Sequence, residues 1–234
     1  MMEVDLFIPC FIDQIYPETA ENSRRLLEKL GCKVFYNPSQ TCCGQPMFNS
    51  GDWEGARSLA EKFLRDFSGQ RPIVSPSGSC SAFVRNYYGR LLPHNATLPA
   101  FTQQVYEISD FLLNVLHVQS IEASFPHKVT FHDACHALRE YGIKEEPRQL
   151  LRMVDGLEIV EMEDSEACCG FGGTFSAKFK DISQAMVEQK VQDALSTGVE
   201  YIVATEASCL MNIQAYIQKN KLPLKVAHLV DILI

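Results

Sequence analysis

The feature that most constrains the fold of this chain is an internal repeat. The triplet Cys-Cys-Gly occurs twice, at residues 42–44 and 168–170. With the two triplets aligned, IVSPSGSC (73–80) falls on IVATEASC (202–209), and VYEISDFLL (105–113) falls on VAHLVDILI (226–234). A duplicated sequence of this kind predicts a structure built from two similar units.

Four cysteines recur in each half with nearly equal spacing. The gaps between the first cysteine, the vicinal pair and the last cysteine are 31 and 36 residues in the first half, and 32 and 39 in the second. Inert buried cysteines have no reason to recur in frame, so these eight are the candidate site residues. They are Cys10, Cys42, Cys43 and Cys80 in the first half and Cys135, Cys168, Cys169 and Cys209 in the second. The ninth cysteine, Cys32, aligns with Leu157 in a strand pattern and is expected to be a small buried hydrophobe.

Both halves show apolar strand patterns that alternate with helical patterns. In the first half we expect strands at 4–9, 33–37 and 72–76 and helices at 21–31 and 53–67. In the second half we expect strands at 128–133, 157–162 and 201–205 and helices at 146–154 and from about 175 to 195. This alternation is typical of parallel sheets. We therefore predict an α/β fold of two duplicated domains, 1–120 and 121–234, each a small parallel sheet flanked by helices, related by pseudo-twofold symmetry.

The repeated cysteines all follow predicted strands. Ligand sites of parallel α/β sheets lie at the carboxyl ends of the strands. All four cysteines of each half are therefore expected to converge at one edge, and the two duplicated sets are expected to face one cleft.

The vicinal cysteines point to metal chemistry. Neighbouring Cα atoms lie ~3.8 Å apart, whereas an unstrained disulfide requires ~4.4–6.8 Å, so each pair is a poor internal disulfide. Thiolates select zinc, cuprous copper or iron–sulfur clusters, and structural zinc sites usually draw on short C-x₂₋₄-C segments. The dispersed cysteines here favour an iron–sulfur cluster in each half. Zinc in one half, a zinc-bound scaffold, and a thiol–disulfide enzyme with Cys42 or Cys168 as nucleophile stay open.

Four other residues lie close to the cysteines in sequence. His132 and His136 flank Cys135, and the first half has phenylalanine at both equivalent positions. Each histidine is a candidate metal ligand, proton donor or hydrogen-bond donor to a thiolate, and a satisfied structural histidine is an equal alternative. Ser77 and Glu206 precede the last cysteines by three residues and are expected near the centres.

Charge and hydropathy exclude several kinds of partner. The formal net charge of −8 argues against general affinity for nucleic acid or an anionic membrane surface. No segment approaches the ~20 apolar residues of a membrane span, so no direct membrane insertion is expected. The first residues, MMEVDLFIPCF, do not resemble a signal peptide. We expect a cytoplasmic protein, where nine cysteines are more typical of metal binding or catalysis than of disulfides.

The paired cysteine frames resemble the cysteine-rich CCG domain family. The segments LLEKLGCKV, CCGQPMFNSG, SPSGSC, CCGFGGTFS and SCLMNI together resemble the lactate utilization protein A family within it. This resemblance implies an iron–sulfur centre, of the 4Fe-4S type, at the four cysteines of each half. It also implies an electron-transfer or oxidoreductase subunit in the oxidation of L-lactate to pyruvate, acting with partners of the lactate utilization protein B and C types.

Two features qualify what the resemblance implies. The usual ferredoxin run of cysteines is absent, so we expect a ferredoxin-type carrier to deliver or remove electrons. The related heterodisulfide reductase frame ends in C-x-x-C, and this chain has Ser77 and Glu206 where that motif has its first cysteine. Direct disulfide reduction is therefore in doubt. The sequence assigns no catalytic residue and leaves open whether catalysis occurs in this chain or in a partner.

Overall fold

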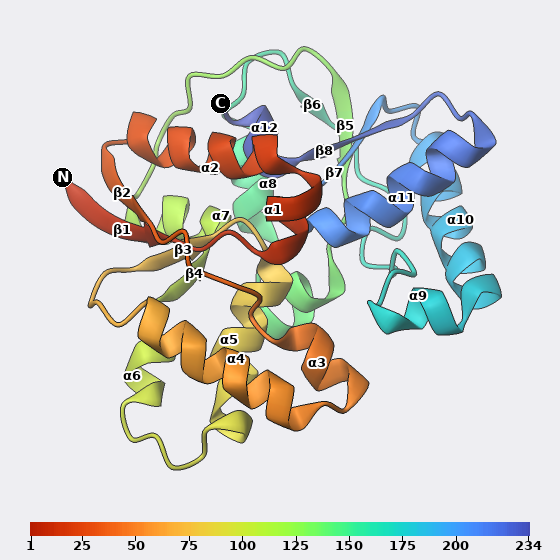
Figure 1. The fold of residues 1–234 in the computed structure, drawn as a ribbon. Coiled ribbons are helices and arrows are strands. Elements are labelled where there is room, and N and C mark those ends of the chain that lie inside the picture. Colours follow the sequence, from red (N-terminus) through yellow and green to blue (C-terminus); the bar gives the residue numbers. More distant parts are fainter.

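A computed structural model of residues 1–234 shows two four-stranded sheets in which every strand pair is parallel (Figure 1). The first sheet has the order β2-β1-β3-β4 and the second β6-β5-β7-β8, so the two orders are the same. The strands of the first are β1 (Met2–Leu6), β2 (Cys32–Tyr36), β3 (Ile73–Ser75) and β4 (Val105–Glu107). Those of the second are β5 (Lys128–Phe131), β6 (Glu158–Ile159), β7 (Tyr201–Ala204) and β8 (Lys225–His228). The predicted duplicated α/β fold is confirmed.

The helices of the first half begin and end where local chemistry favours it. They are α1 (Cys10–Ile15), α2 (Pro17–Lys29), α3 (Gln45–Ser50), α4 (Trp53–Asp66), α5 (Gly78–Leu91), α6 (Leu98–Thr102), α7 (Ile108–Asp110) and the π-helical turn η1 (Phe111–Val115). Helix α2 begins with Pro17, whose fixed φ suits a first helical position. Helix α4 is capped by Asp52, which accepts a hydrogen bond from the Gly55 N–H at 2.9 Å.

The helices of the second half follow the order of the first, but no helix corresponds to α6. They are the π-helical turn η2 (Ala137–Tyr141), α8 (Glu145–Leu151), α9 (Thr174–Lys178), α10 (Lys180–Ser196), α11 (Ala207–Asn220) and α12 (Leu229–Ile232). The single helix expected from about 175 to 195 is interrupted at Phe179, whose backbone is not helical. The interruption turns the chain, and α10 packs its Ser183 against Gly170 of the second Cys-Cys-Gly loop. No helix is both long and apolar enough to cross a bilayer.

The two halves meet through reciprocal contacts. Helix α2 contacts α12, and their equivalents in the opposite halves, α8 and α7, also contact each other. Helix α1 contacts α11, and the equivalent elements η2 and α5 do the same. Figure 1 shows the red and orange helices of the first half beside the green and blue elements of the second. Reciprocal contacts of this kind arise when two similar units pack about a twofold axis.

A hydrophobic core runs through this junction. It contains 23 buried residues drawn from both halves, among them Leu6 of β1, Phe131 of β5 and Leu229 of α12. A second core of 14 residues lies within the first half and a third of 13 within the second. Cys32 belongs to the shared core and is 5% exposed, as expected for a small hydrophobic residue.

Candidate metal centre

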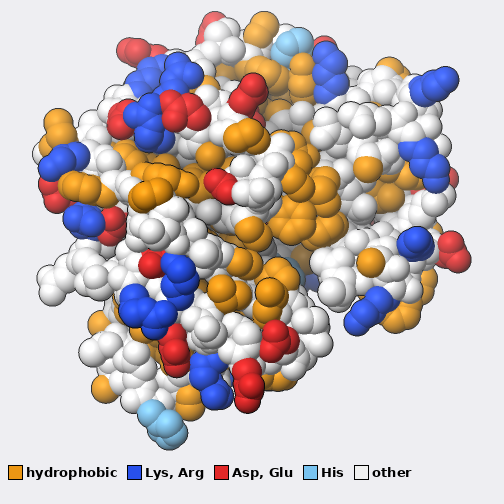
Figure 2. All heavy atoms as spheres, in the orientation of Figure 1, with side chains coloured by type: hydrophobic (Ala, Val, Ile, Leu, Met, Phe, Trp, Pro, Cys, Tyr) orange, Lys and Arg blue, Asp and Glu red, His pale blue; other side chains and the backbone are white.

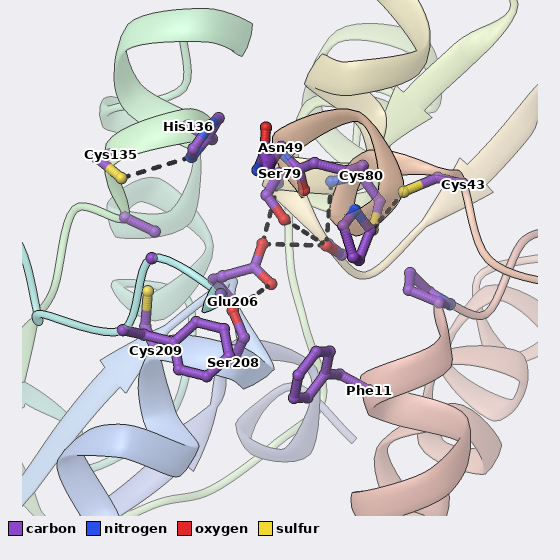
Figure 3. A pocket seen from close by; sticks show the side chains of 18 of the residues that line it. Phe11, Cys43, Asn49, Ser79, Cys80, Cys135, His136, Glu206, Ser208 and Cys209 are labelled. Carbon is purple, nitrogen blue, oxygen red and sulfur yellow. Dashed lines mark hydrogen bonds between the residues drawn. The ribbon is translucent and has the colours of Figure 1, made fainter. Parts of the chain in front are cut away.

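One cavity between the two halves is lined by all eight repeated cysteines (Figure 3). Its volume is about 140 Å³. In the space-filling view, apolar side chains surround a hollow near the middle of the face shown, and charged side chains lie mainly toward its edges (Figure 2). The structure thus brings together every cysteine that the repeat singled out.

The four cysteines of each half lie at equivalent positions relative to its strands and helices. Cys10 begins α1 after a short connection from β1, Cys42 and Cys43 lie in the loop before α3, and Cys80 lies in the first turn of α5. In the second half, Cys135 precedes η2 and the pair Cys168 and Cys169 precedes α9. Cys209 lies in the first turn of α11. The positive end of a helix dipole favours a thiolate at its N-terminus. The last cysteine of each half lies at the positive end of a helix dipole.

The thiols of the first half lie close together without bonding covalently. The sulfurs of Cys10 and Cys42 are 3.7 Å apart, and those of Cys43 and Cys80 are 3.4 Å apart. Both distances exceed the ~2.05 Å of a disulfide, and all nine cysteines are free. The hydrogen bond from Cys10 lowers the pKa of Cys42 to about 3, while the same contact raises the pKa of Cys10. The lowered pKa of Cys42 favours metal binding, because ligation requires deprotonated sulfur.

In the second half the first cysteine of the vicinal pair is again the one whose pKa is lowered most. The hydrogen bond from Cys135 lowers the pKa of Cys168 far below its ordinary value. The hydrogen bond from Cys169 is the largest influence that lowers the pKa of Cys209, to about 7. Cys135 also contacts a histidine, with its sulfur 3.5 Å from Nδ1 of His136.

The glycine of each triplet shapes the cysteine loop. Gly44 and Gly170 have φ of 96° and 81°, a region that glycine occupies without strain. In both loops the glycine N–H donates a hydrogen bond of 3.4 Å to the sulfur two residues earlier, Cys42 or Cys168. A Cβ at Gly170 would lie 2.5 Å from the carbonyl oxygen of Ser183. Only glycine allows both the turn and this close approach of α10.

Each cysteine loop is also fixed by the helix that carries the last cysteine. The Tyr88 hydroxyl of α5 donates to the Cys43 carbonyl at 2.9 Å, and the Asn212 amide of α11 donates to the Cys169 carbonyl at 2.8 Å. Neither residue was predicted from the sequence. Tyr88 and Asn212 are not equivalent in the repeat, so no spacing could have identified them.

Ser77 and Glu206 join the two halves at the cavity, close to the cysteines as expected. The Ser77 hydroxyl donates to the Glu206 carboxylate at 3.0 Å, and the Ser79 N–H donates to it at 2.9 Å. On its other oxygen Glu206 accepts from the Ser208 hydroxyl at 3.2 Å. Glu206 is only 6% exposed. A carboxylate of the second half is thus held by the N-terminus of α5 in the first half, which is a favourable position for a negative charge.

The two histidines near Cys135 have different surroundings. His136 lines the cavity beside Cys135. His132 is buried at 1% exposure, and neither of its ring nitrogens has a hydrogen-bond partner. These contacts do not support the alternative of a satisfied structural histidine at position 132. Its equivalent Phe7 is fully buried against Phe63, with ring centroids 4.9 Å apart.

The donor set and the walls of the cavity suit a metal centre. The eight thiols lie in two groups near one another, and thiolates are soft ligands for zinc, cuprous copper and iron–sulfur clusters. The lining contains one carboxylate, Glu206, and no lysine or arginine. The arrangement suits a metal ion or a metal cluster at each set of cysteines.

Comparison with known proteins agrees with these observations. The sequence model of the CCG cysteine-rich domain matches residues 4–85 and 129–214. A lactate utilization protein A from Halalkalibacterium halodurans is 39% identical over 235 residues, which cover 99% of this chain and 96% of that protein. This chain belongs to the lactate utilization protein A family, within the CCG cysteine-rich domain family.

Other members of the lactate utilization protein A family are similarly close. The protein from Exiguobacterium sp. is 40% identical over 100% of this chain and 97% of its own length. The protein from Geobacillus thermodenitrificans is 38% identical over 99% of this chain and 98% of its own length. The two segments matched by the CCG domain model end within α5 and α11, so β4, β8 and the short helices after them lie outside the matched regions.

Proposed function

We propose that this protein is an iron–sulfur electron-transfer subunit of a system that oxidises L-lactate to pyruvate. Each half holds one 4Fe-4S cluster through its four cysteines. The first centre uses Cys10, Cys42, Cys43 and Cys80, and the second uses Cys135, Cys168, Cys169 and Cys209. When bound, the clusters supply one-electron transfer, and they exchange electrons with lactate utilization protein B and C type partners and a ferredoxin-type carrier. The similarity to lactate utilization proteins A supports this role.

The observation that carries the proposal is that eight thiols form two groups around one cavity. The oxidation of lactate to pyruvate releases two electrons and two protons. Two one-electron centres that face the same cavity match the number of electrons released. A structural zinc site needs neither the duplication nor the common cavity.

The walls of the cavity argue that lactate itself binds to a partner. Carboxylate ligands are usually held by arginine or lysine. The cavity has no such residue, and its only aspartate or glutamate side chain is Glu206. Lactate would meet like charge there. We therefore assign the removal of hydrogen from lactate to a partner protein and the handling of electrons to this chain.

We also propose that residues 1–120 and 121–234 are the two repeated units. Each range contains one complete sheet. Because the largest core draws on both ranges, the two units fold as one cooperative body.

Anaerobic reconstitution with iron and sulfide tests the proposed function. We expect about four iron and four acid-labile sulfide per half, with visible absorption. Cys42→Ser and Cys168→Ser should each remove about half of the iron and sulfide, because each change disables one set. The matched control is Cys32→Ala, which changes a buried cysteine outside both sets and should retain the full content.

Other metal contents would contradict the proposal. Zinc without visible absorption would support a docking scaffold instead. Turnover by the metal-free protein that is lost in a variant of one vicinal cysteine would support thiol–disulfide chemistry.

A further inference from the structure

His132 is buried beside the cysteines of the second half with no partner for its polar atoms. It is 1% exposed, and neither Nδ1 nor Nε2 makes a hydrogen bond of ordinary length to a protein atom. A buried polar group left without a partner costs about 1–3 kcal/mol. A ligand that uses the imidazole would remove part of this cost.

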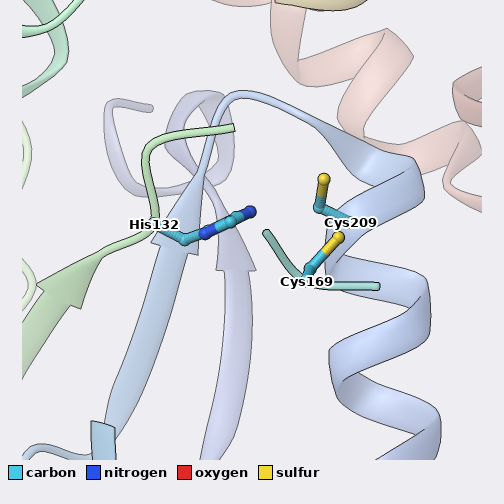
Figure 4. Close-up of side chains that lie close together, drawn as sticks. All are labelled: His132, Cys169 and Cys209. Carbon is cyan, nitrogen blue, oxygen red and sulfur yellow. The ribbon is translucent and has the colours of Figure 1, made fainter. Parts of the chain in front are cut away.

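The ring of His132 lies where such a ligand would bind. A nitrogen of the ring and the sulfurs of Cys169 and Cys209 all lie within 4.8 Å of one another. Figure 4 shows the ring extending from the loop after β5 toward the two sulfurs. Both sulfurs belong to the cysteine set of the second half, so the imidazole lies within reach of the centre that this set would hold.

We propose that His132 is a ligand of the metal centre in the second half. This proposal rests on the proposed function, because the metal centre is the iron–sulfur cluster assigned there. The imidazole replaces one of the four thiolates as the outer ligand of one iron, because a four-iron cluster takes one outer ligand per iron. It therefore modifies the proposed ligand set of the second half. The centre in the first half has thiolate ligands alone. The first half has no counterpart, since the equivalent Phe7 is packed against Phe63 and Phe67 with centroid distances of 4.9 and 5.8 Å.

The difference in ligands makes the two centres chemically distinct. A neutral imidazole adds no negative charge to a cluster, and clusters with histidine ligands have higher reduction potentials than those with cysteine alone. The centre of the second half is therefore the more oxidising of the two. Electron transfer between the two centres is therefore favourable from the first half to the second.

Electron paramagnetic resonance on single-cluster proteins tests the assignment. The double change Cys42→Ser with Cys43→Ser leaves the centre of the second half, and Cys168→Ser with Cys169→Ser leaves that of the first. Pulsed measurements on protein with ¹⁵N-labelled histidine should show the strong coupling of a directly bound nitrogen in the former only. This measurement needs no change at His132 and therefore does not depend on the folding of a His132 variant.

Two histidine variants then identify the nitrogen. His132→Phe, which copies the first half, should abolish the coupling and shift the potential of the second centre to a more negative value. His136→Phe copies Phe11 in the same way and should retain the coupling. Loss of the coupling in His136→Phe alone would overturn the assignment.

The remaining outcomes separate this proposal from the proposed function. A normal iron and sulfide content without nitrogen coupling, or with only the weak coupling of an N–H···S hydrogen bond, refutes ligation by His132 and leaves the cluster intact. Zinc in the second half that is lost in His132→Phe overturns the iron–sulfur form of the site. Absence of iron and sulfide from both halves refutes the proposed function itself.

Discussion

The loop that carries Cys135 is held by a buried ion pair, and removing the cation of that pair should destabilise the protein strongly. Arg148 of α8 donates to both oxygens of Asp133 at 2.8 Å, and the two side chains are 5% and 0% exposed. It also donates to Glu161 at 2.6 and 3.0 Å and to the Lys144 carbonyl at 2.7 Å. Asp133 is two residues before Cys135, so this network determines where the loop lies.

The expected loss of stability follows from the charged group that Arg148→Met leaves without a partner. Asp133 would remain as a buried carboxylate without a countercharge, and breaking a buried pair in this way costs about 3–5 kcal/mol. Glu161 contributes little to that figure because its side chain is 45% exposed and can be hydrated. The double change Arg148→Met with Asp133→Asn should recover much of the loss, because no unpaired charge is then buried.

Urea unfolding of the metal-free protein, followed by circular dichroism, measures the effect. The midpoint should fall while the dependence on urea concentration stays the same. The matched control is Arg24→Met, which removes an exposed arginine that pairs with Glu21 and Glu28 and should cost about 1 kcal/mol or less. If Arg148→Met lowers the free energy of unfolding no more than Arg24→Met does, the buried pair does not stabilise the fold.

Three further predictions concern the cysteine loops, a buried acid and the junction between the halves. Gly170→Ala should cost more stability, and more metal in its own half, than Gly44→Ala, because a Cβ would lie 2.5 Å from a carbonyl at Gly170 but 3.3 Å from one at Gly44; urea unfolding and metal analysis compare the two variants. Burial raises the pKa of Glu107 from 4.5 to about 8, so the folded protein binds this proton more tightly and loses stability as pH rises from about 4.5 to 8. Glu107→Gln should therefore become progressively more stable than the native protein across that interval in urea unfolding, and a constant difference would contradict the assignment. Glu206→Gln should cost about 1–3 kcal/mol, because the amide replaces one accepting oxygen by a donor within a set of three hydrogen bonds; an unchanged urea midpoint would show that these bonds do not stabilise the junction.

Local and repeated patterns predicted much of the fold. The strands around Val4, Val34 and Val74 and the helix from Trp53 are short-range features, and the structure has them within a few residues of the expected positions. The position of all eight cysteines at one cavity followed from the rule for parallel sheets applied to each half. The repeat also separated Cys32 from the other cysteines by its strand context alone.

Features that depend on distant residues could not be predicted from the sequence. Strands β4 and β8 have three and four residues and exist because β3 and β7 offer them hydrogen bonds. The bond from Ser77 to Glu206 joins residues 129 positions apart and required the packing of the two halves. The absence of hydrogen-bond partners at the His132 nitrogens could not be predicted either, because a sequence does not show which buried side chains lack a partner.

The hydrophobic core shared by the two halves has an evolutionary consequence. Two similar units with reciprocal helix contacts and a common core are arranged as in a symmetric dimer whose subunits have been fused into one chain. In a dimer of identical subunits every substitution appears twice, so both sites must carry the same residues. Fusion removes that restriction, and one copy can then acquire a histidine where the other retains a phenylalanine. A single chain with this arrangement can keep a symmetric interface while its two sites carry different ligands.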